Sequence, residues 1–276
     1  MDAMKTLPFT KAEAVGNDFL VVDWNDVQAL GLSEADLGPL AKQMCDRHRG
    51  AGADGVEYVF ESTEADAHVR LFNSDSSEAE ISGNGTRCVA AWLVDRRGEC
   101  QEVKLSTAAG IKPLQVLECK PPRFLFDMGM GLPKYQESDL KRQLQLRHGA
   151  VDATVLNVGN PQCVLFTNHF GIDWRTWGSE IEMLPEFPNR TNVSFVRVID
   201  EHAIDVRFWE RGAGETLSSG TGSTGAAAAA ILTGRVKSPV RVETPAGQMD
   251  LRWDDQIYLR GPARLVARGD YLFEKL

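Results

Sequence analysis

Residues 82–94 read SGNGTRCVAAWLV, and residues 219–231 read SGTGSTGAAAAAI. Both segments place Ser-Gly-X-Gly directly before an apolar run, and the offset from Ser82 to Ser219 is 137 residues. The same offset joins TAAG at 107–110 to TPAG at 244–247. Two similar halves predict two similar domains, with a cleft between them that is lined by matched residues.

The apolar runs after the two glycine turns predict helices. Residues 85–94 are apolar on nearly every side, and residues 225–232 are mostly alanine, so both helices are expected to be buried all round. Short apolar segments at 19–22, 56–60 and 163–166 predict strands. The expected fold class is therefore α/β (α+β), built as two pseudo-symmetric domains from an internal repeat.

A pair of prolines, Pro121 and Pro122, marks the expected domain boundary, because proline fits neither a helix interior nor a central strand. The first domain is then residues 1–121, and the second is residues 122–263. The tail at about 264–276 has the pattern of a strand. We expect it to return to the first domain.

The composition favours a soluble protein with a small-molecule partner. The chain has 276 residues, 43% of them hydrophobic, and a net charge of −9, which gives no electrostatic reason to expect nucleic acid or an anionic membrane. No stretch approaches the roughly 18 apolar residues of a membrane span. The five cysteines show no metal-ligand spacing. We expect a cytoplasmic protein with reduced cysteines and no metal site.

Each Ser-Gly-X-Gly turn lies where a helix begins, and unpaired N–H groups at such an end attract anions. Plain helix capping by Ser82 and Ser219 is the simpler interpretation, but the matched pair favours a shared site for a carboxylate. Residues 220–225 also spell G-x-G-x-x-G, yet the preceding strand ends near Trp209, too far away for a dinucleotide turn. No cofactor is expected.

Polar residues gather near these turns in the sequence. Arg211 is suited to gripping a carboxylate with two hydrogen bonds, and Glu210 is suited to pairing with an ammonium group. Amide side chains next to predicted strands would hold further polar atoms of a substrate. They are Asn17, Asn73, Asn160 and Asn192. The pattern indicates a small amino acid as the ligand.

These motifs resemble those of the diaminopimelate epimerase family over nearly the whole chain. The matching segments are GNDF at 16–19, RHRGAGADG at 47–55, FNSD at 72–75, GNGTRC at 83–88, NVGNP at 157–161, TNV at 191–193, WERGAGET at 209–216 and GTG at 220–222. The resemblance implies strands wrapped around a central helix in each domain, an active site in the cleft, a homodimer, and a cofactor-independent isomerase of lysine biosynthesis. The substrate-binding residues that it implies are Asn17, Asn73, Gly83, Asn84, Asn160, Asn192, Glu210, Arg211, Gly220 and Thr221.

In this family one cysteine thiolate removes the α-proton and a second cysteine on the opposite face returns one. The corresponding positions here are Ser82 and Ser219, and Gln162 stands where the family has a histidine after Asn-Pro. A serine hydroxyl is a far weaker acid than a thiol, whose pKa is about 8.5. It therefore needs a partner, such as Glu210 or Glu215, to take its proton. The catalytic residues implied are Ser82, Ser219, Glu210 and Gln162.

Three functions stay open from the sequence. The first is an amino-acid epimerase or racemase of the diaminopimelate epimerase type. The second is a lyase or isomerase that moves a proton on one face of its substrate only. The third is a protein that binds an amino acid without turnover. All three predict binding, and they differ in turnover.

Overall fold

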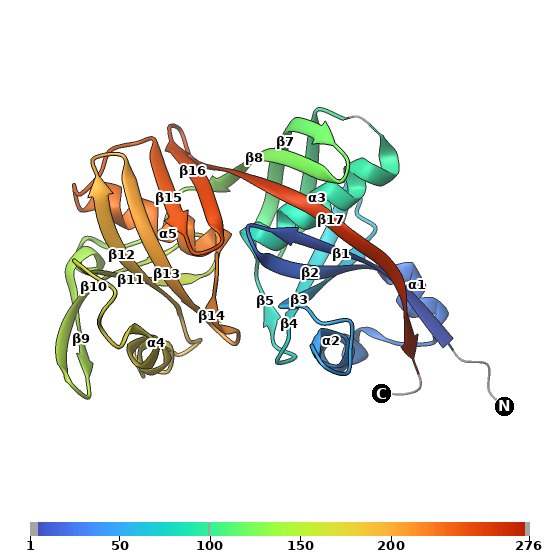
Figure 1. Cartoon of the computed structure of the whole chain (residues 1–276), viewed down its shortest axis with the longest axis horizontal. Helices are drawn as coiled ribbons and strands as arrows, with labels where there is room; N and C mark the ends of the chain where they lie inside the picture. The colour runs from blue at the N-terminus through green and yellow to red at the C-terminus, as the bar shows by residue number, and fades with distance from the viewer. Residues whose placement is uncertain (1–4, 99, 274–276) are drawn as a thin grey trace. The chain divides into compact units, whose positions relative to one another are not determined.

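The computed structural model describes residues 5–98 and 100–273, which form the two compact units drawn in Figure 1. Unit 1 comprises Met1–Asp127 and Pro262–Leu276, and unit 2 comprises Met128–Gly261. The chain passes from unit 1 to unit 2 within strand β8 (Arg123–Gly131) and returns within strand β17 (Ile257–Phe273).

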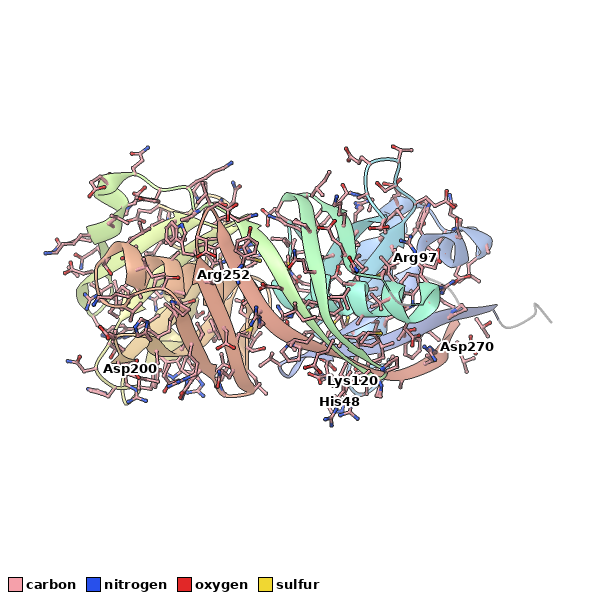
Figure 2. The ribbon with its side chains drawn as sticks, turned by 90° about the horizontal axis from the view of Figure 1, so that it is seen from above. His48, Arg97, Lys120, Asp200, Arg252 and Asp270 are labelled. Carbon is pink, nitrogen blue, oxygen red and sulfur yellow. The ribbon has the colours of Figure 1, made fainter. Side chains whose placement is uncertain are left out.

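Pro121 and Pro122, the expected domain boundary, lie in a turn six residues before the point where the units divide. Lys120, labelled in Figure 2, ends strand β7, and the next two residues form a turn with a cis peptide bond between Pro121 and Pro122. Strand β8 begins directly after this turn. Proline lacks the N–H that a central strand needs, so it fits the turn, and the passage between units falls inside the strand that follows.

Unit 1 contains most of the first half of the chain. Its strands are β1 (Lys5–Ala14), β2 (Asn17–Asp23), β3 (Gly55–Phe60), β4 (Ala67–Asn73), β5 (Glu78–Ala79), β6 (Glu102–Thr107) and β7 (Gly110–Lys120), with parts of β8 and β17. Its helices are α1 (Trp24–Ala29), the 3-10 turn η1 (Glu34–Asp36), α2 (Leu37–Cys45) and α3 (Gly83–Arg97).

The first and last strands of the described chain pair with each other in unit 1. Strand β1 pairs antiparallel with β17, where Lys5 faces Phe273 and Glu13 faces Arg264. In Figure 1 the red strand β17 runs beside the blue strand β1. Residues 274–276 of the predicted returning segment lie outside the described residues.

Unit 2 contains the second half of the chain. Its strands are β9 (Arg142–Leu146), β10 (Gly149–Asn157), β11 (Pro161–Phe166), β12 (Asn192–Asp200), β13 (Ala203–Glu210), β14 (Gly214–Thr216), β15 (Val240–Thr244) and β16 (Gly247–Trp253). Its helices are the 3-10 turn η2 (Glu137–Lys141), α4 (Trp174–Glu182) and α5 (Gly220–Leu232).

The two units share one strand-pairing scheme. In unit 1, β1–β2, β3–β4 and β6–β7 are antiparallel pairs, joined by the parallel pairs β2–β3 and β4–β6. In unit 2, β10–β11, β12–β13 and β15–β16 are antiparallel pairs, joined by the parallel pairs β11–β12 and β13–β15. This repetition confirms the predicted pseudo-symmetric fold.

One buried helix packs against the strands of each unit. Helix α3 packs on strands β1, β2, β3, β6 and β7, and helix α5 packs on β10 to β13, β15 and β16. The sequence predicted that these helices start at Gly85 and Gly225, but they start at Gly83 and Gly220. The difference arises because Ser82 and Ser219 act as N-caps and carry each helix back into its glycine turn.

Close packing explains a glycine in the first turn of each central helix. A Cβ atom at Gly85 would lie 1.7 Å from Oε1 of Glu57, and one at Gly222 would lie 2.8 Å from the ring of Phe208. Glycine in a helix costs roughly 1 kcal/mol relative to alanine. In return it lets a strand side chain reach the helix N-terminus.

Candidate active site

The first group of site residues, called here the α3 site, surrounds the N-terminus of α3. Ser82 precedes the helix, and its Oγ accepts a hydrogen bond of 3.1 Å from the backbone N–H of Gly85. The Ser82 side chain is therefore held where the helix dipole and unpaired N–H groups favour negative charge on an oxygen.

Two predicted binding residues of the α3 site are joined to each other. The Asn84 amide donates to Oδ1 of Asn17 at 3.3 Å, and its own Oδ1 accepts from the Arg87 guanidinium at 2.6 Å. The Asn17 amide in turn donates to Asp54 at 2.6 Å. Arg87 is fully buried, and burial lowers the pKa of its guanidinium to about 10. This chain of hydrogen bonds fixes both amides.

A cluster of charges supports the same chain from the surface side. The Arg47 guanidinium donates to Asp54 at 2.6 Å and to Asp18 at 2.8 Å, while His48, labelled in Figure 2, is exposed beside it. Burial raises the pKa of Asp18, but hydrogen bonds from Arg47 and Lys11 outweigh it and leave that pKa below its ordinary value. The basic run at 47–49 is therefore partly a structural element of the site.

Asn73 is the remaining predicted binding asparagine of unit 1. Its amide donates to the Ser77 hydroxyl at 3.1 Å. By the repeat offset that relates Ser82 to Ser219, Asn73 of unit 1 corresponds in sequence to Glu210 of unit 2. The α3 site thus has an amide where the second site has a carboxylate.

The α3 site also contains a buried carboxyl that the sequence did not reveal. Glu57, on β3, is 2% exposed, and its Oε1 has no hydrogen-bond partner among the described residues. Burial raises the pKa of Glu57 to about 8. The carboxyl lies against Gly85, in the first turn of the helix that Ser82 caps.

The raised pKa of Glu57 predicts a dependence of stability on pH. The folded state keeps the Glu57 proton up to about pH 8, while the unfolded state loses it near its ordinary value of 4.5. Its contribution to stability is therefore fully present below pH 4.5 and is lost as pH rises through about 8. Glu57→Gln should gain stability over the parent on the order of 1 kcal/mol per pH unit in this window.

Urea unfolding at pH 5, 6.5 and 8 measures this difference in the free energy of unfolding. Glu61→Gln, at an exposed position just after the same strand, is the matched control and should run parallel to the parent. Parallel curves for Glu57→Gln as well would show that Glu57 is not a buried neutral acid.

The second group, called here the α5 site, surrounds the N-terminus of α5. The Ser219 hydroxyl donates to Oε2 of Glu210 at 2.7 Å and accepts from the backbone N–H of Gly222 at 3.0 Å. The other oxygen of Glu210 accepts from the Thr216 hydroxyl at 2.6 Å. A hydroxyl, a carboxylate base and a group that orients the base are thus in hydrogen-bond contact, which is the arrangement that activates a hydroxyl.

The predicted residues Asn160, Gln162 and Thr221 form a second buried chain in unit 2. The Gln162 amide donates to Oδ1 of Asn160 at 2.6 Å, and the Asn160 amide donates to the Thr221 hydroxyl at 3.2 Å. Gln162 is fully buried against Gly225, and its Oε1 has no hydrogen-bond partner among the described residues. Gln162 is thus packed within unit 2 and bonded to Asn160, with one polar atom left unpaired among the described residues.

The loop after β13 carries the predicted residue Arg211, and the predicted residue Asn192, at the start of β12, contacts this loop. The Asn192 side chain accepts from the backbone N–H of Arg211 at 3.0 Å, and the Arg211 guanidinium donates to the carbonyl of Asn189 at 3.0 Å. Glu182, at the end of α4, holds the same loop by accepting from Trp209 Nε1 at 2.8 Å and from the N–H of Gly212 at 3.1 Å.

Glu215, the other predicted helper of serine, points elsewhere. Its carboxylate takes two hydrogen bonds from the Arg175 guanidinium, at 2.6 and 2.7 Å. Of the two acids suggested by the sequence, Glu210 is the one in contact with Ser219. The separation arises because alternate residues of a strand face opposite sides of a sheet, and Glu215 lies on the short strand β14.

Cysteine does not replace the serines. Cys88, in α3, is fully buried, and burial raises the pKa of its thiol well above the ordinary value. It is a packing residue of the helix. Over the ranges 5–98 and 100–273, no cluster of three acidic, histidine or cysteine side chains is arranged to hold a metal ion. No helix in these ranges is long and apolar enough to cross a membrane.

Sequence reasoning missed Glu57 and Glu182. Neither lies in a recognisable motif, and each contacts a segment that is distant in the sequence. The signal available for Glu57 was its charge inside the otherwise apolar strand segment GVEYVF. A charge at a position predicted to be buried marks either a wrong assignment or a functional group.

Comparisons with known proteins agree on one family. The family model described as diaminopimelate epimerase matches residues 9–133 and 154–266. The diaminopimelate epimerase of Pelotomaculum thermopropionicum is 36% identical over 95% of this chain and 98% of its own length. That of Moorella thermoacetica is 37% identical over 95% of this chain and 98% of its own length.

Solved structures share the fold at low sequence identity. A hydroxyproline epimerase from Agrobacterium vitis, with bound trans-4-hydroxy-L-proline, has a TM-score of 0.79 and 15% identity, covering 100% of this chain and 95% of its own. A PhzF-family phenazine biosynthesis protein from Bacillus anthracis has a TM-score of 0.65 and 18% identity, covering 98% and 100%. Identities this low establish the fold alone.

Proposed function

The chain belongs to the diaminopimelate epimerase family, and from that premise we propose that it inverts the α-carbon of diaminopimelate or a similar zwitterionic amino acid without a cofactor. The observation that carries the proposal is the Ser219–Glu210 contact of 2.7 Å at a helix N-terminus. It supplies an activated hydroxyl at a position where the family has a cysteine.

In the proposed reaction the α5 site acts on one face of the substrate. The Ser219 oxygen takes the α-proton while its own proton passes to Glu210, and the substrate is left as a carbanion with its charge spread into the carboxylate. The helix N–H groups beside the serine stabilise the developing charge. Ser82 then delivers a proton from the opposite face, which inverts the centre.

The proposal requires that each unit be one copy of the repeat and that the two sites act on a single substrate. The residues proposed to bind that substrate are Asn17, Asn73, Gly83, Asn84, Asn160, Asn192, Glu210, Arg211, Gly220 and Thr221. Several of their amides are already held by neighbours, which supports preorganised binding. We further propose that the protein is a cytoplasmic homodimer and acts in lysine biosynthesis.

A second candidate function rests on the difference between the sites. Ser219 donates to a carboxylate, whereas among the described residues the hydrogen bonds of Ser82 are made with the backbone and with Thr86. An enzyme with one strong base exchanges or eliminates a proton on one face only. Such a lyase or one-face isomerase would use the same pocket.

Proton exchange in deuterated water distinguishes these functions. Each stereoisomer of diaminopimelate is incubated with the protein, and the Cα–H signal is followed by NMR. We expect deuterium uptake with inversion, and Ser219→Ala should abolish it. Exchange without inversion, or loss of water, would support the one-face enzyme. Binding by calorimetry with neither exchange nor inversion would contradict both and leave a binding protein.

A further inference from the structure

The two serines have different carboxyl neighbours. The repeat offset relates Asn73 to Glu210 and Glu57 to Ser194. Strand pairing agrees with this alignment, since Gly55 begins β3 opposite Phe19 and Asn192 begins β12 opposite Gln162. Each unit therefore carries one carboxyl near its helix N-terminus, but the two carboxyls stand at different repeat positions.

The Glu57 side chain extends from strand β3 to the N-terminal turn of α3. A Cβ placed on Gly85 would lie 1.7 Å from Glu57 Oε1 and 3.3 Å from the Cβ of Ser82. The carboxyl and the serine side chain thus flank one point in the first turn of α3. A side chain larger than hydrogen at Gly85 would separate them.

The surrounding residues leave the Glu57 carboxyl without full hydrogen bonding. Its Oε1 has no hydrogen-bond partner among the described residues, although Glu57 is 2% exposed. Buried polar atoms are nearly always paired, and an unpaired one calls for an explanation such as a catalytic role. The paired positions on β2 and β4 are the apolar Val21 and Leu71.

Charged neighbours do not explain the state of Glu57. Burial is the cause of its raised pKa, with no contribution from charged groups of the described residues on α1, α2, α3, β2 or β4. Glu57 does act on Cys88 of α3: burial is the main cause of the raised pKa of that thiol, and the Glu57 charge adds to it. Glu57 thus holds its proton at neutral pH for a local reason, its removal from water.

We propose that Glu57 is the acid–base partner of Ser82, as Glu210 is the partner of Ser219. The inference rests on the proposed function and deepens it. When Ser82 donates its proton to the substrate carbanion, the serine oxygen recovers one from the Glu57 carboxyl, which becomes a carboxylate. In the reverse direction Ser82 takes the α-proton while its own proton passes to the Glu57 carboxylate. Glu57 acts through Ser82 and is a positioning residue in this sense.

The first arm of the test needs no catalysis. The Glu57 carboxyl is titrated by carbon-13 NMR in protein labelled at glutamate, with the signal assigned by its loss in Glu57→Gln. Ser82→Ala should raise the titration midpoint by about half a pH unit or more, because the carboxylate, once formed, would lose the hydroxyl that the proposal assigns to it as a donor. Ser106→Ala, which removes another buried hydroxyl of unit 1, should leave the midpoint unchanged.

The second arm measures α-proton exchange. Glu57→Gln should lower kcat about 10²-fold while KM changes less than about threefold, and the limb of the parent pH profile near pH 8 should disappear. Glu57→Asp keeps the acid and should recover part of the loss. It also replaces Glu57→Gln if that variant does not fold.

The outcomes separate this inference from the proposed function. A midpoint that ignores Ser82→Ala, with an unchanged pH profile in Glu57→Gln, overturns the role of Glu57 and leaves the epimerase standing. A parent that exchanges no substrate proton overturns the proposed function. The titration arm then still decides whether Glu57 and Ser82 are coupled.

Discussion

Glu210→Gln is expected to lower the rate of α-proton exchange at saturating substrate by about 10²–10⁴-fold, the usual effect of removing a general base. The carboxamide keeps the shape of the side chain and its contact with Thr216. It does not accept the Ser219 proton, because an amide is not a base near neutral pH. Ser219 would then be left as an unactivated hydroxyl.

Glu215→Gln is the matched control for this variant. Glu215 lies on the neighbouring strand β14 and pairs with Arg175 at an exposed position. Loss of such a pair costs little stability, typically below about 1 kcal/mol. Exchange by Glu215→Gln should match the parent. An equal loss in both variants would show that general disturbance of the loop, and not the base, determines the rate.

Measurement of kcat and KM separately makes the Glu210 result specific. If Glu210 acts mainly by binding the ammonium group of the substrate, Glu210→Gln should raise KM with little change in kcat. If it acts as the base of Ser219, kcat should fall and KM should change little. The hydrogen bond of 2.7 Å from Ser219 favours the second result.

The double substitution Ser82→Cys with Ser219→Cys is expected to raise the exchange rate, by about 10²-fold or more. A thiol with a pKa near 8.5 ionises far more readily than a hydroxyl, and each pKa unit corresponds to about 1.4 kcal/mol. The N–H groups of Gly85 and Gly222 already point at the two side-chain oxygens. They would favour thiolate in the same places.

Addition of Gln162→His tests how much of the family arrangement is still compatible with this chain. Gln162 is fully buried and packs on Gly225, so the triple variant must first be checked for folding by urea unfolding. Cys88→Ser, at a buried thiol outside both sites, should leave the rate unchanged. No gain in the double or the triple variant would mean that the pocket has diverged in substrate as well as in its acid–base groups.

Much of the α5 site could be predicted from the sequence, since Glu210, Ser219 and Thr221 lie within one short stretch. Glu210 ends strand β13 and Ser219 caps α5, so both were expected near the helix start, but the choice between Glu210 and Glu215 as the partner of Ser219 was left open. The role of Gln162 was not predictable in this way. Its partner Asn160 lies just before the strand that carries Gln162, but the burial of Gln162 depends on Gly225, which belongs to helix α5.

The linear chain determined the internal repeat, the two buried helices and the serine that caps each of them. These features depend on residue order over short distances, where apolar periodicity and capping act. Only the tertiary structure decided which carboxyl stands beside which serine. Glu57 reaches the first turn of α3 because β3 lies beneath that helix and Gly85 leaves room, while Glu210 reaches Ser219 across a loop. Strand register and close packing between distant segments set such contacts, and no local pattern encodes them.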